Sequence, residues 1–393
     1  MERERRKYEA THSWINFELD MRRVSYELWL LLGAAESKCR HLRGIPLRPA
    51  KQEELNRVSL KKGVRATTAI EGNTLSAEDV DKVYSGQGGE LPQSRAYQVQ
   101  EIQNMLNVYN GVVREVSDAG VCGVSFERLK ADNAEILSGL RFKDEVMPGE
   151  IRTYSVGVGD YRGVPAEDCV YLLERLFTWL SSDWGLSVKH PVVEGILKAI
   201  TAHLYIAWIH PFGDGNGRSA RVLEFRMLMN AGVPLTAAHL LTSYYNDTRQ
   251  EYYEMLRRSS RIEGGEFCFI EYALQGFVDG LDSEINSILE EQLNVTWENY
   301  VHEVCFGGKL TSALRRRREL LLEISKYERP VSVAEMKYRL SDKLLKQYQG
   351  SIKMLSRDIN YLAKVGLIIY KEDEGYTAAK DKMKAFLPLS RQA

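Results

Sequence analysis

The sequence of 393 residues lacks any strong excess of one charge. It has 53 Lys and Arg residues against 54 Asp and Glu residues, so its formal net charge is −1. A large excess of one sign would favour a nucleic acid or an anionic membrane as the partner of the whole chain, and this balance indicates neither. The remaining composition, with 44% hydrophobic and 27% charged residues, is typical of a globular protein with two or three domains.

Cysteines and long apolar runs are also scarce. The apolar run 28–32 is too short to span a bilayer, and the charged residues 1–7 are not followed by the apolar region of a signal peptide. The cysteines are odd in number and lack the spacing of a metal site, which indicates reduced thiols. They are Cys39, Cys122, Cys169, Cys268 and Cys305. We therefore expect a cytoplasmic protein without a membrane partner.

The most informative stretch is residues 210–221, with the sequence HPFGDGNGRSAR. An apolar pattern of helical spacing over 194–208 precedes it, and Pro211 disfavours helix at His210. Three glycines within five residues then allow the backbone to turn sharply. A second apolar helical pattern begins at Val222. The stretch is therefore predicted to be a loop between two helices that ends at the N-terminus of the second helix.

The residue types in this loop suit a phosphate-containing ligand. A glycine loop at a helix N-terminus offers free N–H groups to an anion, and two arginines three residues apart share one side of the first turn. One carboxylate, Asp214, suits Mg²⁺, which completes its shell with water and phosphate oxygens. His210 is the nearby group that can act as a base near neutral pH. Taken alone, such a loop could also be a plain connection between helices.

The loop resembles the Fic motif, His-x-Phe-x-(Asp/Glu)-Gly-Asn-Gly-Arg-x-x-Arg, and matches every fixed position. Fic enzymes typically transfer AMP from ATP to a Ser, Thr or Tyr hydroxyl of a protein. The resemblance implies a mainly α protein with a helical Fic core and a β-hairpin flap. It also implies ATP and Mg²⁺ as nucleotide and metal, and a protein target, which could be the chain itself.

The resemblance assigns roles to individual loop residues. His210 would deprotonate the target hydroxyl, and Asp214 would hold Mg²⁺ on the α- and β-phosphates. Arg218 would neutralise the leaving pyrophosphate, Arg221 would meet the γ-phosphate, and Phe212 would anchor the loop in the core. The other nucleotide-binding positions of the loop are Gly213, Gly215, Asn216 and Gly217.

An amphipathic pattern from about residue 51 predicts a helix that ends at Glu71, just before Gly72. A carboxylate in the last turn opposes the helix dipole, which hints at a function, although a solvated glutamate would explain it as well. Residues 67–73 resemble the Fic inhibitory motif, (Ser/Thr)-x-x-x-Glu-(Gly/Asn). The resemblance implies that Glu71 pairs with Arg221 in the place of the γ-phosphate. It also implies that Thr67 supports Glu71 and that Gly72 completes the motif.

Two further parts of the site are predicted with less support from the residues alone. Alternation around Gly and Asp over 149–165 predicts a β-hairpin, which could be an ordinary surface hairpin. In Fic proteins a hairpin here, the flap, docks the target by strand addition. Its nucleotide-facing residues would be Val156, Gly157, Val158 and Gly159. The resemblance also implies that Tyr252 contacts adenine, although paired tyrosines at helical spacing usually just pack.

Helical patterns fill most of the remaining chain before residue 300. They lie at 13–85 with a break at Pro46 and Pro49, and at 94–118, 126–137, 172–184, 222–231, 243–258 and 267 to about 293. The expected domains are an N-terminal helical region, 1–93, whose inhibitory helix spans about 51–72; a Fic catalytic core, 94–300; and a C-terminal module, 310–393.

The C-terminal module is basic in a chain that is otherwise nearly neutral. From Leu314 onward it has 18 Lys and Arg residues against 10 Asp and Glu residues. Helices are predicted at 316–327, 333–340 and 351–364, followed by two short strands around Glu374 and Gly375. That order resembles a winged helix domain, in which Lys353, Arg357 and Lys364 could face phosphates. A dimerisation or partner-docking module remains the alternative.

The leading hypothesis is an AMP transferase, a protein adenylyltransferase, that inhibits itself through Glu71. Within the same chemistry, the enzyme could use another nucleotide, or remove AMP with Glu71 positioning a water molecule. A different hypothesis is a transcriptional regulator or toxin-like sensor whose Fic core is vestigial and whose winged helix binds nucleic acid. The intact His210, Asp214 and arginines argue against a vestigial core. The sequence leaves a homodimer open and does not identify the target.

Overall fold

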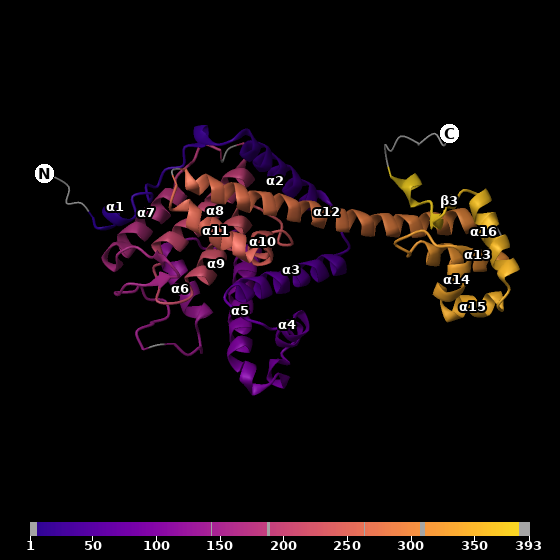
Figure 1. Cartoon of the computed structure of the whole chain (residues 1–393), viewed down its shortest axis with the longest axis horizontal. Coiled ribbons are helices and arrows are strands. Elements are labelled where there is room, and N and C mark those ends of the chain that lie inside the picture. Colours follow the sequence, from indigo (N-terminus) through magenta and orange to yellow (C-terminus); the bar gives the residue numbers. More distant parts are fainter. Residues whose placement is uncertain (1–5, 143, 187–188, 263, 307–310, 385–393) are drawn as a thin grey trace. The chain divides into compact units, whose positions relative to one another are not determined.

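The computed structural model describes residues 6–142, 144–186, 189–262, 264–306 and 311–384. The chain forms two compact units, Met1–Ile285 and Asn286–Ala393. Both units are built mainly of helices, and each contains one two-stranded hairpin within the described residues (Figure 1). The mainly α class predicted from the sequence is therefore confirmed.

The first unit contains the long helices that surround the loop at residues 210–221. Its helices are α1 (Tyr8–Thr11), α2 (Tyr26–Gly44), α3 (Pro49–Ile70), α4 (Ala77–Tyr84), α5 (Ala96–Ala119), α6 (Phe126–Ile136), α7 (Cys169–Ser181), α8 (Pro191–Ile209), α9 (Asn216–Asn230), α10 (Leu240–Asp247), α11 (Arg249–Ser259) and the first part of α12 (Gly265–Phe306). Its hairpin pairs β1 (Gly157–Val158) with β2 (Tyr161–Arg162) in antiparallel register, with Val158 opposite Tyr161.

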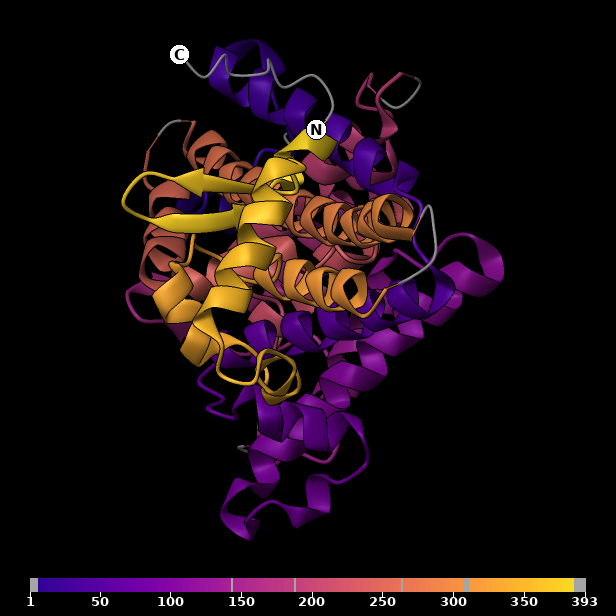
Figure 2. The ribbon, with the colours of Figure 1, turned by 90° about the vertical axis from the view of Figure 1, so that its right-hand side faces the viewer.

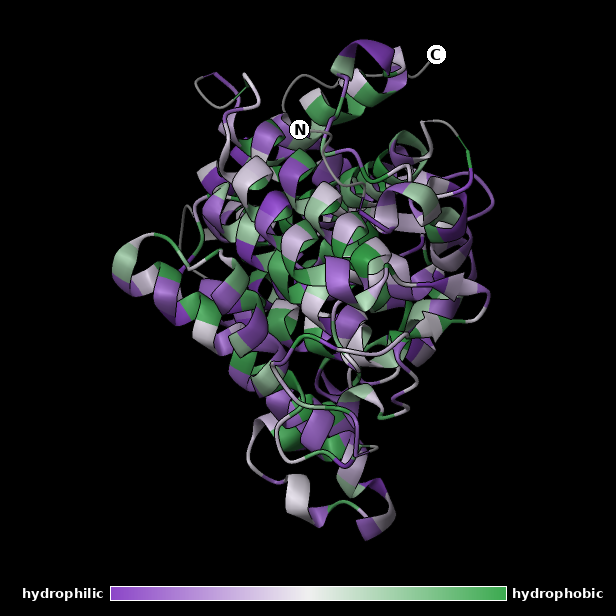
Figure 3. Cartoon of the chain, turned by 90° about the vertical axis from the view of Figure 1, so that its left-hand side faces the viewer, coloured by the Kyte–Doolittle hydropathy of each residue, from purple (hydrophilic) through white to green (hydrophobic). Residues whose placement is uncertain are grey.

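Helix α8 forms the centre of the first unit. Its length and apolar composition would let it cross a membrane, but 83% of its most apolar window is buried inside the unit. Ile196, Leu197 and Ile200 are fully buried, and α8 packs against α2, α7 and α9. Figure 3 shows hydrophobic residues concentrated toward the middle of the unit and hydrophilic ones on its outer helices. Burial of this helix places the loop that follows it on a rigid support.

Helix α3 brings its C-terminus to the start of α9. It packs against α5, α9 and α10. Gly63 allows the close approach to α10, because a Cβ on Gly63 would lie 2.9 Å from the Cβ of His239. Residues 67–71 and residues 217–221, far apart in the sequence, are thereby neighbours in space.

Three predicted helical segments differ from the structure for local reasons. The segment 13–25 contains only a 3-10 turn, because the side chains of Asn16 and Asp20 accept hydrogen bonds from backbone N–H groups two residues on. The single helix predicted over 243–258 is two helices, α10 and α11, that meet at Thr248, whose hydroxyl donates to the carbonyl of Tyr244 at 2.7 Å. Helix α9 begins at Asn216 rather than Val222, because Gly215 turns the chain into it.

The predicted domain boundaries also differ from the compact units. Residues 1–93 and 94–285 belong to one unit, so the N-terminal region does not separate from the core in this structure. Helix α12 continues to Phe306 rather than ending near residue 293. Trp297 and Val301, on its last turns, are fully buried in the core of the second unit. The predicted start of the C-terminal module at Leu310 lies outside the described residues.

Within its described residues, the second unit contains four further α-helices and a hairpin. They are α13 (Ser312–Ile324), α14 (Val333–Arg339), α15 (Asp342–Tyr348), α16 (Ile352–Lys364), β3 (Ile368–Lys371) and β4 (Gly375–Ala378). Figure 2 shows the two strands as a pair of arrows beside α16. The predicted order of helices followed by a hairpin is present, but α15 was not predicted from the sequence. Val331, just before α14, forms an isolated β-bridge with Tyr376 on the edge of β4 that faces away from β3.

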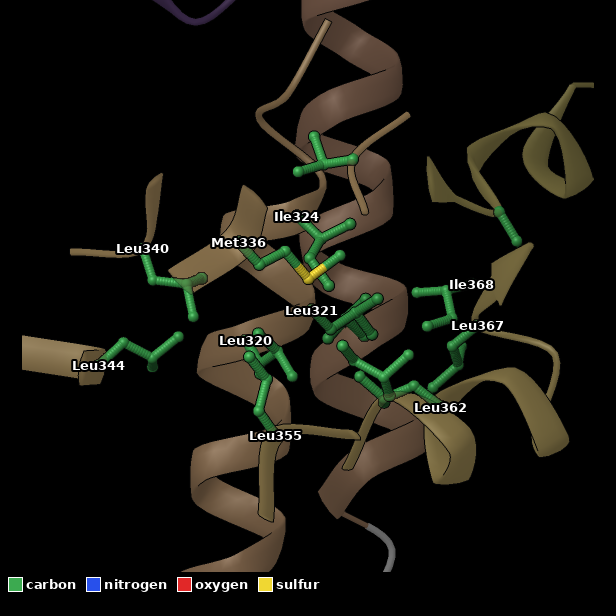
Figure 4. Close-up of a cluster of buried hydrophobic side chains, with 14 of the residues drawn as sticks. Leu320, Leu321, Ile324, Met336, Leu340, Leu344, Leu355, Leu362, Leu367 and Ile368 are labelled. Carbon is green, nitrogen blue, oxygen red and sulfur yellow. The ribbon is translucent and has the colours of Figure 1, made fainter. Parts of the chain in front are cut away.

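The core of the second unit is a single hydrophobic cluster. Side chains from α13, α14 and α16, from the last turns of α12 and from the hairpin converge on it (Figure 4). The buried residues labelled there include Leu320, Leu321, Ile324, Met336, Leu355, Leu362 and Ile368. The third helix of the predicted order, α16, thus presents its apolar stripe inward and its basic residues Lys353, Arg357 and Lys364 outward.

Candidate functional site

The loop between α8 and α9 is closed by its own side chains. Phe212 is only 1% exposed, as predicted for a residue that anchors the loop. The side chain of Asn216 accepts a hydrogen bond from the N–H of Phe212 at 2.8 Å and donates to its carbonyl at 2.9 Å. Gly215 adopts a left-handed conformation, with φ at +76°, and starts α9. The backbone N–H groups at the start of α9 are therefore presented from a fixed loop.

Asn133, on α6, stabilises the loop by hydrogen bonds, and it was not predicted from the sequence. Its Nδ2 donates to the carbonyl of Asp214 at 3.0 Å and to the hydroxyl of Ser219 at 3.1 Å. A Cβ on Gly215 would lie 3.0 Å from the same nitrogen, so the close approach needs a glycine there. An asparagine on a half-buried helix gives no signal in the sequence for this role, since its partners in the loop are more than 80 residues away.

His210 is the first residue after α8, and it is partly buried beside the cavity described below. Its backbone is left-handed, with φ at 51° and ψ at 58°, which is uncommon for a residue other than glycine. Its Nδ1 donates to the carbonyl of Ala207 at 3.4 Å, which leaves Nε2 with a free lone pair. Burial lowers the pKa of His210 to about 4, and the charge of Arg152 acts in the same direction. The imidazole is therefore neutral at neutral pH and can accept a proton.

Arg152, at the base of the flap, is a second residue that sequence reasoning missed. It is 4% exposed and donates hydrogen bonds to four backbone carbonyls. These belong to His210 at 2.7 Å, Tyr154 at 2.7 Å, Val164 at 2.6 Å and Ile209 at 3.3 Å. Its own N–H donates to the carbonyl of Pro211 at 3.0 Å. The side chain thus joins the flap to the end of α8.

Arg218 lies buried between two carboxylates. Its Nη1 donates to Oε1 of Glu101 at 2.7 Å and its Nη2 donates to Oδ1 of Asp214 at 3.1 Å. The other oxygen of Glu101 accepts from Asn73 at 3.0 Å. Burial raises the pKa of Glu101, although Arg218 opposes the shift. Glu101 on α5 was not predicted, and its burial at 6% exposure together with its bond to Arg218 marks it as part of the loop's support.

Arg221, 1% exposed, is bound to the last turn of α3 by three contacts. Its Nη2 pairs with Oε1 of Glu71 at 2.5 Å, its Nε donates to the hydroxyl of Thr67 at 2.8 Å, and Nη2 also donates to the carbonyl of Thr67 at 3.1 Å. Thr67 was expected to support Glu71, but its hydroxyl and its carbonyl bind Arg221. Burial disfavours the charge of Glu71, but Arg221 outweighs it and holds the pKa of that carboxyl below its usual value.

Glu71 lies over the N-terminus of α9. A Cβ on Gly217 would collide with Oε1 of Glu71, so the carboxylate sits directly on the first turn of the helix. Gly72, with φ at +99°, turns the chain away just after it. The hydroxyl of Tyr253 donates to the carbonyl of Ile70 at 3.2 Å and fixes the end of α3. An anion from the chain itself therefore fills the position that the dipole of α9 favours.

A cavity of about 1180 Å³ adjoins this ion pair. Its lining includes many of the predicted site residues, namely Glu71, Val158, Gly159, His210, Gly217, Arg221 and Tyr252. Among the other predicted positions, Val156, Gly157, Gly213, Asp214, Gly215, Asn216 and Arg218 are not part of this lining. Tyr252 is 3% exposed, and its hydroxyl bonds His203 at 3.0 Å, so only part of its ring borders the cavity.

The N-terminal segment forms a wall of the cavity that sequence reasoning did not assign to the site. Lys7, Thr11, His12 and Trp14 border it. Nε2 of His12 donates to the carbonyl of Arg162 on β2 at 2.9 Å. On the other side, the hydroxyl of Tyr161 donates to the carbonyl of Trp208 at 2.7 Å. The strand β2 is therefore attached both to the N-terminal segment and to α8.

The donors present fit a magnesium ion held mainly by its nucleotide. Within the described residues, no group of three or more His, Cys, Asp or Glu side chains could enclose a metal. Asp214 is 42% exposed, and its Oδ1 accepts from Gly215 and Arg218. Its Oδ2 makes no hydrogen bond within the described part of the chain. One available carboxylate oxygen suits Mg²⁺, which commonly takes its other ligands from water and phosphates.

Comparison with known protein families matches residues 124–228 to the Fic/DOC family. Among curated proteins, protein adenylyltransferase fic-1 of Caenorhabditis briggsae is 27% identical over 240 residues, which cover 59% of this chain and 44% of that protein. Protein adenylyltransferase Fic of Drosophila willistoni is 40% identical over 91 residues, which cover 23% of this chain and 17% of that protein. The chain thus spans less than half the length of these relatives.

Solved structures agree with this match at the level of the fold. A Fic family protein from Desulfovibrio desulfuricans G20 superposes with a TM-score of 0.55 at 21% identity, covering 90% of this chain and 96% of that one. Fic-1 from Caenorhabditis elegans, residues 134–508, gives a TM-score of 0.53 at 22% identity, covering 67% of this chain and 73% of that one. The predicted Fic resemblance is confirmed: the first unit has the helical Fic fold, and residues 124–228 of the chain are a Fic/DOC family domain.

Proposed function

We propose that the protein is a protein adenylyltransferase that transfers AMP from ATP to a Ser, Thr or Tyr hydroxyl of a protein, and that Glu71 keeps it inactive. One observation carries the proposal: the Glu71 carboxylate lies on Arg221 at the N-terminus of α9, beside a cavity that His210 also lines. A site built for an anion is there filled by an internal anion. The names of the curated relatives, which are protein adenylyltransferases, support the same reaction.

In this proposal, the residues of the loop divide the work of the transfer. His210 is neutral and its Nε2 lone pair is free, so it would accept the proton of the attacking hydroxyl. The N–H groups at the start of α9 would bind phosphate oxygens, and Arg218 would neutralise the charge of the leaving pyrophosphate. Arg221 would bind the γ-phosphate once Glu71 has left it. Positioning and charge neutralisation are the main contributions that a protein makes to such reactions.

Asp214 would hold Mg²⁺ through the carboxylate oxygen that is free of hydrogen bonds. The ion would supply positive charge to the phosphates of the nucleotide. Arg218 binds the other carboxylate oxygen at 3.1 Å, so it keeps the carboxylate in one orientation.

The flap would carry the target. Val158 and Gly159 line the cavity, so the hairpin borders the space for the nucleotide. Because β2 is attached to the N-terminal segment and to α8, we propose that a target segment adds to β1. The partners are then ATP and a protein segment that presents a hydroxyl near His210.

Incubation with ATP labelled on the α-phosphate tests the function directly. Self-labelling is compared among the natural protein, Glu71→Gly, and Glu71→Gly combined with His210→Ala. We expect strong labelling of Glu71→Gly, weak labelling of the natural protein and none with His210→Ala. ATP labelled on the γ-phosphate should label none of them, because pyrophosphate leaves. Label from the γ-phosphate, or no label with any variant, would contradict the proposal.

The same assay separates the alternatives within this chemistry. Unlabelled GTP, CTP and UTP are added in excess to test whether another nucleotide competes for the site. Labelled Glu71→Gly protein, freed of ATP, is then mixed with the natural protein to test whether AMP is removed. Retention of the label in that mixture is the result expected for a transferase.

A second candidate function concerns the second unit, which we propose to be a winged helix domain that contacts nucleic acid. The observation that favours it is the outer face of α16, where Lys353, Arg357, Asn360 and Lys364 are all exposed. Such a face combines phosphate-binding and base-reading side chains. The measurement is fluorescence anisotropy with duplex DNA at several salt concentrations. Binding should weaken with salt and be lost in Arg357→Glu, whereas no binding at low salt would reject it.

A further inference from the structure

The guanidinium of Arg152 stands out because it is a buried charge with no acidic partner. Within the described residues, no carboxylate lies within ion-pair distance of it, and the side chain is 4% exposed. Four of its five N–H donors are instead used on backbone carbonyls, at 2.6–3.3 Å. A charge is costly to bury without a counter-ion, so a residue of this kind points to a specific task for its geometry.

The four carbonyls belong to two different segments. Tyr154 and Val164 lie on the two legs of the flap, before β1 and after β2. Ile209 and His210 form the end of α8 and the first residue of the loop. The backbone adds to the connection, since Ile151 and Phe212 form a β-bridge. Arg152 therefore ties both legs of the flap to the residue proposed as the base.

The conformation of His210 explains why this tie matters. A left-handed backbone is strained for a residue with a Cβ, so its surroundings must hold it in place. The helix end contributes one bond, from the N–H of His210 to the carbonyl of Ile206 at 2.9 Å. The bond from Arg152 to the carbonyl of His210, at 2.7 Å, fixes the other end of the residue. Together they determine where the imidazole points.

Gly163, on the return leg of the flap, packs against the same group of atoms. A Cβ placed there would lie 2.9 Å from Nη2 of Arg152, 2.9 Å from the Cβ of His210 and 3.2 Å from the carbonyl oxygen of Ile209. The absence of a side chain at this glycine lets the flap, the guanidinium and His210 meet in van der Waals contact. It also offers a way to disturb the arrangement without changing Arg152.

We propose that Arg152 is a positioning residue that joins the flap and His210 into one rigid body. A segment docked on the flap is thereby held at a fixed position relative to the imidazole. The inference rests on the function proposed above and adds to it a residue that acts by holding His210 and the flap in place. The guanidinium of Arg152 does not line the cavity, and four of its N–H groups already bind backbone carbonyls. Its loss should therefore affect the transfer step and leave nucleotide binding intact.

The test uses the full chain with Glu71→Gly, so that transfer is measured without inhibition. Arg152→Gln should lower the single-turnover rate of self-labelling by about 100-fold, the scale expected for a misplacement of roughly 1 Å. The dissociation constant for ATP should stay within about threefold. Arg152→Lys keeps the charge but reaches fewer carbonyls, so its rate should be intermediate. Gly163→Ala should give the same separation of rate from affinity.

The matched control is Arg226→Lys. Arg226 is also buried, at 1% exposure, but it binds Asp132 and Glu115 at the opposite end of α9. If Arg226→Lys lowers the transfer rate as much as Arg152→Lys does, the effect is general loss of stability and the inference is wrong. It is also wrong if a folded Arg152→Gln transfers within about threefold of its parent, or if its affinity for ATP falls in parallel with its rate.

Hydrogen exchange supplies a readout that does not depend on catalysis. In Arg152→Gln, amides of residues 151–164 and of residues 209–213 should lose protection together, while those of α5 keep theirs. Increased exchange in the flap alone would overturn the joint role. If the Glu71→Gly parent shows no transfer, the proposed function fails, and the exchange result still decides whether Arg152 links the two segments.

Discussion

Glu71 and Asp358 both face arginine side chains, and they differ in the number of partners that hold them. Glu71, at the end of α3, has one ion pair, with Arg221, and its side chain is 32% exposed beside the cavity. Asp358, on α16 in the second unit, is fully buried and accepts from Arg316 at 2.8 Å, Arg317 at 2.8 Å and Tyr348 at 3.2 Å. On the proposed function, the first carboxylate would be exchanged for a phosphate of the nucleotide, whereas the second is part of a core.

The arginines of the two sites differ in their access to other anions. Arg221 keeps two bonds to Thr67 when Glu71 leaves, and the cavity gives a nucleotide or water access to it. Arg316 and Arg317 bind Asp358 through Nε and are 12% and 17% exposed. Each of them also stacks on a tyrosine ring, with the guanidinium of Arg316 5.4 Å from the ring centre of Tyr348 and that of Arg317 3.9 Å from the ring centre of Tyr361. The two ion pairs therefore differ mainly in the carboxylate, because Glu71 has one arginine partner beside a cavity and Asp358 has three partners inside a core.

The largest effect is expected from removing the buried carboxylate. Asp358→Ala leaves two arginines and a tyrosine hydroxyl without their acceptor, and should lower the free energy of unfolding of the second unit by about 3 kcal/mol. Urea unfolding of the full chain, followed by hydrogen exchange in α13 and α16, measures it. The control is Glu335→Ala, which removes an exposed pair with Arg329 and should change the stability by less than about 1 kcal/mol. If the two variants lose the same free energy of unfolding, Asp358 contributes no more than an exposed carboxylate, and its role as part of the core is wrong.

The next effect should be kinetic. Glu71→Gly removes the competitor of the γ-phosphate and should raise the transfer rate by more than about tenfold, since roughly 1.4 kcal/mol of lost competition gives that factor. ATP should also raise the melting temperature of this variant more than that of the natural protein, because phosphate replaces the missing carboxylate. Glu71→Gln is the matched control, and its rate should lie between the two. An unchanged rate in Glu71→Gly would remove the inhibitory role.

A smaller effect is expected from removing one of the bonds between Arg221 and Thr67. Thr67→Val keeps the shape of the side chain and removes the acceptor of the Arg221 Nε–H bond, at a cost of about 1 kcal/mol. Because this bond holds Arg221 with either anion, the transfer rate should change less than it does in Glu71→Gly. Thermal unfolding and self-labelling measure the two quantities. A rise in transfer as large as that of Glu71→Gly would mean that Thr67 acts on inhibition and not on the position of Arg221.

The smallest effect is expected from mild acid. The pKa of Glu71 lies below its usual value of about 4.3, so the stability that its pair contributes is present above that value and is lost as pH falls through the folded pKa. His210, with a pKa of about 4, also stays neutral over this range. The ratio of transfer rates between Glu71→Gly and the natural protein should therefore hold steady from pH 7 to pH 5. A ratio that falls toward one by pH 5 would show that Glu71 is already protonated there.

Prediction from the sequence works best for features that depend on residues close together in the chain. The turn after His210, the start of a helix in the glycine loop and the position of Glu71 at a helix end follow from local patterns. The hairpin within 149–165 and the helices α13, α14 and α16 follow from periodicity, whereas α15 was not predicted. The pairing of Glu71 with Arg221 was predicted from the motif, and the structure brings these two residues together.

The residues that support the loop could not be predicted in the same way. Arg152, Asn133 and Glu101 lie 58, 81 and 117 residues from their loop partners, so only the packing of α5, α6 and the flap reveals them. The break at Thr248 was missed because a threonine in a helical pattern is ambiguous until its hydroxyl finds a carbonyl. The split within α12 was missed because the periodicity of a helix does not say which core each turn enters.

The bonds from Arg221 to Thr67 have a consequence for how the protein would respond to nucleotide supply. If the guanidinium stays in place with either anion, Glu71 and the γ-phosphate would compete for it. Glu71 would then act as a ligand tethered to the site, and ATP as a ligand in solution. A short tether gives its ligand an effective concentration in the millimolar range. On the proposed function, the share of protein ready for catalysis would then follow the ATP level around it, with the last turn of α3 setting the threshold.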